Sequence, residues 1–236
     1  ADQTYTGGEL KPAVTVTDGS RVLKAGTDYD TAYTGNINAG TAKVTVTGKG
    51  NYKGTAEKTF KISAKSIAGA KVTAADKTYT GKNLTTSVTV KDGSRTLKSG
   101  TDYTLSYKNN KNPGTATVTV TGKGNYAGSV SKTFKITVKV SKASLTSAKK
   151  TSKKGQLKIK WKKVSGATGY QVYAAQNKGF TKKVKKATIK SGKTASTTLK
   201  GLTKKKTYYV RIRATKKIAG KTYYGAWSTV KKTKTK

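Results

Sequence analysis

The sequence contains no cysteine, no histidine and no methionine among its 236 residues. Without cysteine there is no disulfide framework, so packing and backbone hydrogen bonds must hold any fold together. The same absences exclude cysteine nucleophiles, histidine general bases and metal sites built from Cys and His. A lack of thiols is compatible with secreted and with cytosolic proteins, so it does not determine the compartment.

Acidic residues are scarce, with 9 Asp and Glu against 50 Lys and Arg, and the net charge is +41. The acidic residues are scattered, and none is paired with a base or belongs to a metal-ligand cluster. We therefore expect no catalysis, no cofactor and no metal site in this chain. The positive charge is nearly all lysine, whose hydrated ammonium group suits diffuse attraction to polyanions better than bidentate contact with base edges. We accordingly expect no specific nucleic-acid recognition.

Long apolar runs are missing as well, so we expect no membrane span, and no signal peptide is visible.

What the sequence does contain is a repeat. Residues 40–54 return as residues 114–128, at an offset of 74 residues that holds without a gap along the whole unit. About two-thirds of the positions in the two copies are identical, which indicates a tandem duplication and suggests a role in length or valency.

Strand signals in both copies are separated by turn residues, and no stretch has a helical period, so the repeats are predicted to be all-β. Residues 14–16 predict a short strand closed by an Asp-Gly turn, and Val44 and Val46 alternate with threonine as in a half-buried strand. In the second copy, residues 66–74 predict a first strand that the first copy lacks. We therefore expect the chain to be a fragment of something longer, with an open edge in the first repeat through which it could self-associate.

The order Tyr-Thr-Gly, Val-Thr-Val, Gly-Thr-Asp-Tyr, Gly-Lys-Gly-Asn-Tyr and Thr-Phe-x-Ile resembles the bacterial immunoglobulin-like or mostly-β repeat modules. These modules, some of them β-grasp-like, occur in extracellular and surface-attached proteins of Gram-positive anaerobes. The resemblance covers residues 1 to about 138 and implies a location outside the cell or on the bacterial cell surface.

Two motifs within the repeats are candidate sites. The glycine-rich turns around Lys49 and Lys123 lack the Ser/Thr and the helix of a P-loop, so they are interpreted as turns. Asp28 and Asp102 are interpreted as acceptors of backbone N–H groups at strand entries. The alternatives for these two are a calcium ligand, for which one Asp per copy is too few, and the acid that assists a Lys–Asn crosslink.

The remaining residues have their own pattern. Residues 141–154 predict a connector with little to bury, and residues 223–230 predict the closing strand. Leu157, Ile159 and Trp161 alternate as in a strand, and the spacing from Leu202 to Tyr208 fits a tyrosine corner. With the early tryptophan, this spacing resembles the fibronectin type III sandwich.

The sequence thus predicts an all-β chain of three tandem small β domains, namely two homologous Ig-like/β-grasp-like repeats and a C-terminal fibronectin type III-like β-sandwich. The predicted modules are residues 1–63, the first repeat with its first strand missing, residues 64–140, the second repeat, and residues 141–236, the fibronectin-like third module.

One candidate site lies in the third module. Tyr208, Val210 and Ile212 are predicted to point inward, so the residues between them should point outward, with a tryptophan on the next strand. Such residues can form a cation–π stack, either as a ladder that stiffens the surface or as a platform for a polyanion or glycan. The candidate residues, together with a nearby lysine cluster, are Tyr209, Arg211, Arg213, Trp227, Lys204, Lys205 and Lys206.

The function predicted from these features is that of a non-catalytic extracellular stalk or adhesion array in a larger bacterial surface or secreted protein. Its basic face would contact an anionic cell-wall polymer or glycan. The alternative is an accessory carbohydrate- or cell-wall-binding region of an extracellular hydrolase whose catalytic domain lies elsewhere.

Overall fold

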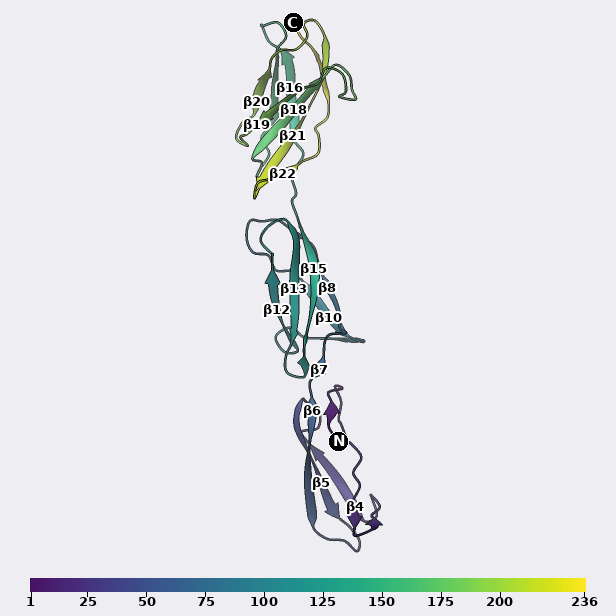
Figure 1. Cartoon of the computed structure of the whole chain (residues 1–236). Helices are drawn as coiled ribbons and strands as arrows, with labels where there is room; N and C mark the ends of the chain where they lie inside the picture. Colours follow the sequence, from purple (N-terminus) through teal and green to yellow (C-terminus); the bar gives the residue numbers. More distant parts are fainter. The chain divides into compact units, whose positions relative to one another are not determined.

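The computed structural model describes residues 1–236, and every regular element in it is a β-strand, as the sequence predicts. Figure 1 shows these strands, coloured from purple at the N-terminus to yellow at the C-terminus. The chain divides into two compact units. The N-terminal unit comprises Ala1–Lys77, Thr85–Asn110 and Thr115–Lys135, and the C-terminal unit comprises Thr78–Leu84, Lys111–Gly114 and Ile136–Lys236. The boundaries of the three modules remain a prediction from the sequence.

The first repeat is built around a sheet with the strand order β1-β6-β5-β4, in which β1 runs parallel to β6. Apolar residues alternate with threonine and lysine along its strands. Val44, Phe60 and Ile62 are buried on the inward face, as a period of two residues predicts. Residues 18–21 form the predicted Asp-Gly hairpin. The strands are β1 (Gln3–Thr4), β2 (Thr17–Asp18), β3 (Arg21–Val22), β4 (Tyr29–Thr34), β5 (Gly40–Gly48) and β6 (Thr55–Ser63).

The second repeat has the corresponding sheet β12-β13-β15-β9, a second sheet β11-β10-β8 and a short parallel pair of β14 and β7. Its strands are β7 (Lys65–Ser66), β8 (Lys71–Ala74), β9 (Lys77–Thr78), β10 (Val88–Asp92), β11 (Arg95–Thr96), β12 (Tyr103–Lys108), β13 (Gly114–Gly122), β14 (Tyr126–Ala127) and β15 (Ser129–Thr137). The predicted first strand over residues 66–74 is therefore two short strands, because a turn interrupts it where Ala70 N–H donates to the carbonyl of Ile67 (2.9 Å).

The two copies differ at one predicted strand. Residues 14–16 are not a strand, so that prediction is wrong, whereas residues 88–91 of the equivalent β10 pair with β8. The physical reason is the missing partner: without a neighbouring strand, the backbone of residues 14–16 has no ladder to join. Val72 of β8 also helps to bury Val90, which is 0% exposed, while the equivalent Val16 is only half-buried.

A single hydrophobic core runs through both repeats of the N-terminal unit. At the junction, Tyr5 of the first repeat packs edge-on against Tyr126 of the second, with ring centroids 5.5 Å apart. Arg95 donates to the hydroxyl of Tyr5 (2.9 Å), and the amide of Asn125 accepts from Ala39 N–H (2.7 Å). The residues of this core are Tyr5, Ala42, Phe60, Ile62, Ile67, Val72, Val90, Leu97, Tyr103, Val120 and Tyr126.

The third module is a sandwich of two sheets, β16-β17-β20 and β19-β18-β21-β22, and β23 also pairs with β21. This arrangement of three strands against a larger sheet is fibronectin type III-like. The predicted landmarks are present: Trp161 is 3% exposed in the core, and the buried Tyr208 accepts a hydrogen bond from Thr203 N–H (3.0 Å), which is a tyrosine corner. The strands are β16 (Ser144–Lys150), β17 (Leu157–Lys162), β18 (Gly169–Ala175), β19 (Lys185–Ile189), β20 (Ser196–Leu199), β21 (Thr207–Ile218), β22 (Lys221–Tyr224) and β23 (Lys231–Lys234).

Two sequence predictions for the third module are wrong. Residues 141–154 are not simply a connector, because β16 lies within them and Ala143 and Leu145 are buried in the core. The lysine and serine residues around Ala143 and Leu145 give this segment the composition of a linker, so the sequence pattern does not indicate a strand. Residues 223–230 are not one strand either: β22 ends at Tyr224, and an irregular segment leads to β23.

Candidate functional site

The candidate site begins with the outward face of β21. Buried Tyr208, Val210 and Ile212 alternate with half-buried residues, so Arg211 and Arg213 emerge on the same outer surface. This is the arrangement that the period of two predicts.

Trp227 reaches this surface from the irregular segment after β22 and not from a strand, which corrects the prediction. Ser228 holds that segment against β21: its N–H donates to the carbonyl of Ile212 (2.7 Å), and its hydroxyl accepts from Ile212 N–H (3.1 Å). The indole then lies beside both guanidinium groups, with the Cζ atoms of Arg211 and Arg213 at 4.3 Å and 4.5 Å from its centroid. The predicted cation–π stack is therefore present in the structure.

The stack is longer than predicted. Arg211 also lies 3.9 Å from the ring of Phe180, and Arg213 lies 3.9 Å from the ring of Tyr224. Tyr173 of β18 packs against Trp227 with centroids 4.7 Å apart. We call these six residues the arginine–aromatic ladder: Tyr173, Phe180, Arg211, Arg213, Tyr224 and Trp227. Tyr173 lies between Val172 and Ala174, and this alternation could have predicted its outward position from the sequence. Phe180 lies in a loop, where no periodic pattern predicts its position.

The surroundings of Arg211 disfavour its positive charge. Burial lowers the pKa of Arg211, and the charge of Arg213 beside it lowers that pKa further. Aromatic faces stabilise the two like charges side by side. Gln171 completes the ladder by accepting from Nε and Nη2 of Arg213 (2.9 and 2.7 Å). Rings lie close to both guanidinium groups, and Nε of Arg211 is buried without a hydrogen-bond partner.

The other predicted site residues lie outside the ladder. Tyr209 is in register with Ala175 and Lys232 across the sheet. Lys204, Lys205 and Lys206 occupy the turn before β21, and the N–H of Lys206 donates to the hydroxyl of Thr235 (3.2 Å). Of the seven residues proposed from the sequence, the structure thus brings Arg211, Arg213 and Trp227 together in one stack.

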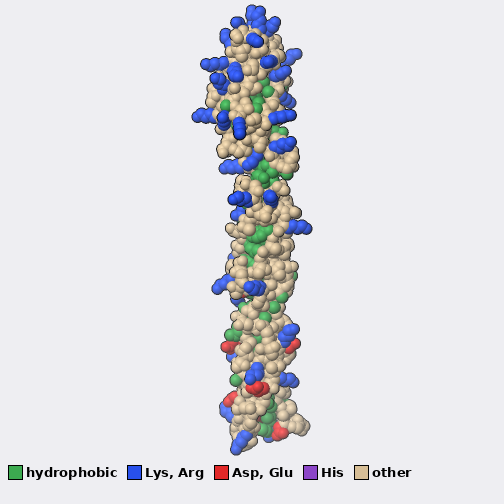
Figure 2. Space-filling model, turned by 90° about the vertical axis from the view of Figure 1, so that its left-hand side faces the viewer, with side chains coloured by type: hydrophobic (Ala, Val, Ile, Leu, Met, Phe, Trp, Pro, Cys, Tyr) green, Lys and Arg blue, Asp and Glu red, His purple; other side chains and the backbone are tan.

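Charge is distributed unevenly along the chain. Residues 141–236 contain 29 of the 50 Lys and Arg residues and no Asp or Glu, and all nine acidic residues lie within residues 1–102. Figure 2 shows blue side chains over the third module and red ones only over the repeats. The third module therefore lacks intramolecular carboxylates that could neutralise its lysines.

The motifs in the repeats have structural roles. The carboxylate of Asp28 accepts from Lys24 N–H (2.8 Å), and that of Asp102 accepts from Lys98 N–H (2.8 Å), as interpreted from the sequence. The Gly-Lys-Gly segments are turns, since the N–H of Gly48 donates to the carbonyl of Gly54 (2.9 Å).

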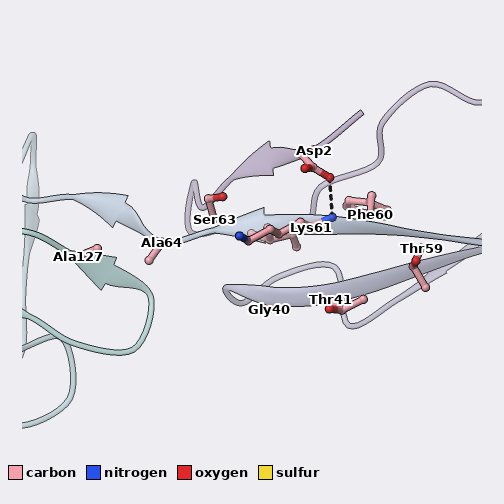
Figure 3. Close-up of a pocket in the computed structure, with 10 residues that line it drawn as sticks. Asp2, Gly40, Thr41, Thr59, Phe60, Lys61, Ser63, Ala64 and Ala127 are labelled. Atoms are coloured by element: carbon pink, nitrogen blue, oxygen red, sulfur yellow. Dashed lines mark hydrogen bonds between the residues drawn. The ribbon is translucent and has the colours of Figure 1, made fainter.

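A pocket of about 590 Å³ lies beside β6 in the N-terminal unit (Figure 3). Its only acidic side chain, Asp2, accepts a hydrogen bond from the backbone N–H of Lys61 (2.9 Å). The equivalent Asp76 accepts from Lys135 in the same way, so this contact belongs to the repeat's architecture. Threonine, glycine and apolar residues supply most of the remaining lining.

The structure has no helix long and apolar enough to cross a membrane.

Fold and site together define a class: an array of immunoglobulin-like and fibronectin type III-like β modules, the last of which carries an arginine–aromatic ladder on a lysine-rich surface. No family model and no curated protein matches the chain.

Among solved structures, an Fn3-like protein from Clostridium thermocellum is 21% identical over 41% of this chain and 94% of its own, with a TM-score of 0.33. Domains FN1–FN3 of chicken CNTN1 are 16% identical over 84% of this chain and 78% of their own, with a TM-score of 0.37. Domains A168–A170 of titin are 13% identical over 91% of this chain and 86% of their own, with a TM-score of 0.30. The class stated above rests on the strand order and not on these similarities.

Proposed function

We propose that this chain is a non-catalytic extracellular stalk and adhesion array of a larger bacterial surface or secreted protein, and that its third module contacts an anionic cell-wall polymer. The observation that carries the proposal is the charge of the third module, which has 29 basic residues and no acidic one. The resemblance of the repeats to modules of Gram-positive surface proteins supports the location.

The chemistry of lysine supports a polymer ligand. Each ammonium group is a compact hydrated charge that attracts phosphate or carboxylate oxygens without demanding one geometry. Many such groups on one module raise the local concentration of a polyanion, and added salt screens the attraction over about 8 Å at physiological ionic strength. Binding should therefore depend on the number of charges on the polymer and on the salt concentration.

The proposal is tested by measuring the affinity of the chain for poly(glycerol phosphate) and for purified cell walls across a salt series. We expect the dissociation constant to rise steeply between about 0.05 M and about 0.5 M salt. Attachment that salt does not change, or no attachment at low salt, contradicts the proposal. Duplex DNA of varied sequence serves as a comparison, and equal affinity for all sequences is expected.

The alternative, an accessory carbohydrate-binding region of an extracellular hydrolase, draws support from the aromatic rings of the ladder. It predicts binding to a neutral glycan that resists salt and is lost in Trp227→Ala. The anionic-polymer proposal predicts that this variant keeps most of its affinity, because Trp227 carries no charge.

Self-association is a separate proposal. Residues 14–16 of the first repeat have no neighbouring strand on the side where β8 covers β10 of the second repeat. An uncovered edge presents backbone N–H and C=O groups that a second copy could pair with. Sedimentation at increasing concentration is expected to show dimers, and a monomer at every concentration would contradict this.

A further inference from the structure

Two loops of the third module line an open pocket of about 490 Å³, and no residue of this pocket belongs to the arginine–aromatic ladder. One loop connects β17 to β18, and the other connects β19 to β20. We call this pocket the loop cradle. Its lining residues are Lys163, Val164, Ser165, Gly166, Ala167, Thr168, Lys190, Ser191, Gly192 and Lys193.

A buried tyrosine ties the two loops of the cradle together. Tyr170 is 0% exposed, and its hydroxyl accepts from Val164 N–H of one loop (2.8 Å) while donating to the carbonyl of Gly192 in the other (3.2 Å). The loops also touch directly, because a Cβ at Gly192 would lie 1.8 Å from the carbonyl oxygen of Ala167. The cradle is therefore held in shape before any ligand arrives.

The side chains around the cradle are all neutral or positive. Lys163, Lys190 and Lys193 contribute from both loops, and Ser165 and Ser191 add hydroxyl groups. A fourth lysine, Lys216 of β21, places its Nζ 3.9 Å from the position of a Cβ at Gly166. No carboxylate in the module can neutralise these lysines.

We propose that the loop cradle is a discrete binding site for one phosphate group of an anionic polymer. Ammonium groups supplied by two loops and a strand suit an anion with oxygens on several sides, whereas a planar carboxylate is better matched by the fork of arginine. The volume lies within the range of ordinary ligand sites, about 300–1,000 Å³, and leaves room for the alcohol units beside the phosphate. The inference rests on the proposed function and deepens it, by giving the diffuse basic surface one position at which the polymer is held.

The test compares two triple variants of the full chain. Lys163→Gln, Lys190→Gln and Lys193→Gln empty the cradle of its own lysines. The control, Lys204→Gln, Lys205→Gln and Lys206→Gln, removes the same charge from the turn before β21. All six side chains are exposed, so both variants should fold, and tryptophan fluorescence checks this.

We expect the cradle variant to bind poly(glycerol phosphate) at least about tenfold more weakly than the control at the same salt concentration, because diffuse attraction falls equally in both. Amide NMR shifts on titration with inorganic phosphate should be confined to residues 163–168 and 190–193. Equal weakening in the two variants, or shifts spread over all lysine-rich loops, overturns the cradle and indicates diffuse counterion association only. That result leaves the proposed function standing if binding still falls with salt, whereas a wild-type chain that does not bind the polymer at low salt refutes the proposed function itself.

Discussion

The junction between the two repeats allows a sharp prediction, because the duplication supplies its own control. Tyr126 is 3% exposed and packs edge-on against Tyr5, with an interplanar angle of 78°. The equivalent residue of the first repeat, Tyr52, occupies the same turn but is only half-buried. Replacing each tyrosine by alanine therefore separates the stability that the junction contributes from the stability lost with any tyrosine in this turn.

The expected magnitude follows from burial. A buried tyrosine removes about 150–250 Å² from water, which at about 25 cal/mol per Å² is an upper bound of about 4–6 kcal/mol. Measured losses for aromatic residues replaced by alanine are about 3–5 kcal/mol, and we expect Tyr126→Ala to fall in this range. Tyr52→Ala should cost about 1–2 kcal/mol, since a half-buried ring loses less contact. Of the stability lost in Tyr126→Ala, about 0.5–1.5 kcal/mol comes from the aromatic contact between Tyr126 and Tyr5. A double-mutant cycle with Tyr5→Ala measures this contribution.

The assay uses the position of the two tryptophans. Trp161 and Trp227 both lie in the C-terminal unit, so their fluorescence reports its unfolding in urea, whereas far-ultraviolet circular dichroism reports both units. Tyr126→Ala should shift only the circular dichroism transition. A loss in Tyr52→Ala as large as that in Tyr126→Ala, or an equal shift in the fluorescence transition, would refute the reasoning.

Three further predictions concern single groups. Tyr208→Phe should cost about 1–3 kcal/mol in the fluorescence-monitored transition, because it leaves the N–H of Thr203 without its acceptor; an unchanged midpoint would contradict the tyrosine corner. Burial raises the pKa of Tyr126, so the stability it contributes is present below the unfolded pKa of about 10 and is lost as the pH rises through the folded pKa. Relative to Tyr126→Phe, the wild type should therefore lose stability in alkaline urea titrations, and parallel pH profiles would argue against this. Gly192→Ala should lower the free energy of unfolding by about 1–3 kcal/mol, because the added Cβ collides with the other loop. In Gly8→Ala the added Cβ meets nothing within 4 Å, so the free energy of unfolding should change by no more than about 0.5 kcal/mol. Equal thermal midpoints for these two variants would show that the two loops of the cradle are not packed tightly against each other.

Alternation with a period of two was enough to place most buried strands. Phe60 and Ile62 in the repeats and Leu157, Ile159 and Trp161 in the third module are buried as predicted, since successive strand residues face opposite sides of a sheet. The pattern was weaker where apolar residues were small or few. Leu145 is the one fully buried residue of strand β16, and Ala143 is buried just before the strand begins, so the lysines of this segment gave it the composition of a linker.

For the ladder, the sequence predicted that Arg211, Arg213 and Trp227 would meet, because two of them share one strand face. It could not predict Phe180, which reaches the stack from a loop, or the half-exposed position of Tyr209 away from it. Contacts from irregular segments depend on where the backbone turns, and no local period encodes that.

The sequence by itself determined that the chain is all-β, that its first two modules are copies, and that its positive charge lies mainly in the third module. These properties follow from residue order and composition alone. Only the tertiary structure decided which equivalent residues of the two copies differ in role. Tyr52 and Tyr126 have the same local sequence, Gly-Asn-Tyr, yet one is half-exposed and the other is buried against Tyr5, because burial depends on which neighbouring surface covers a side chain.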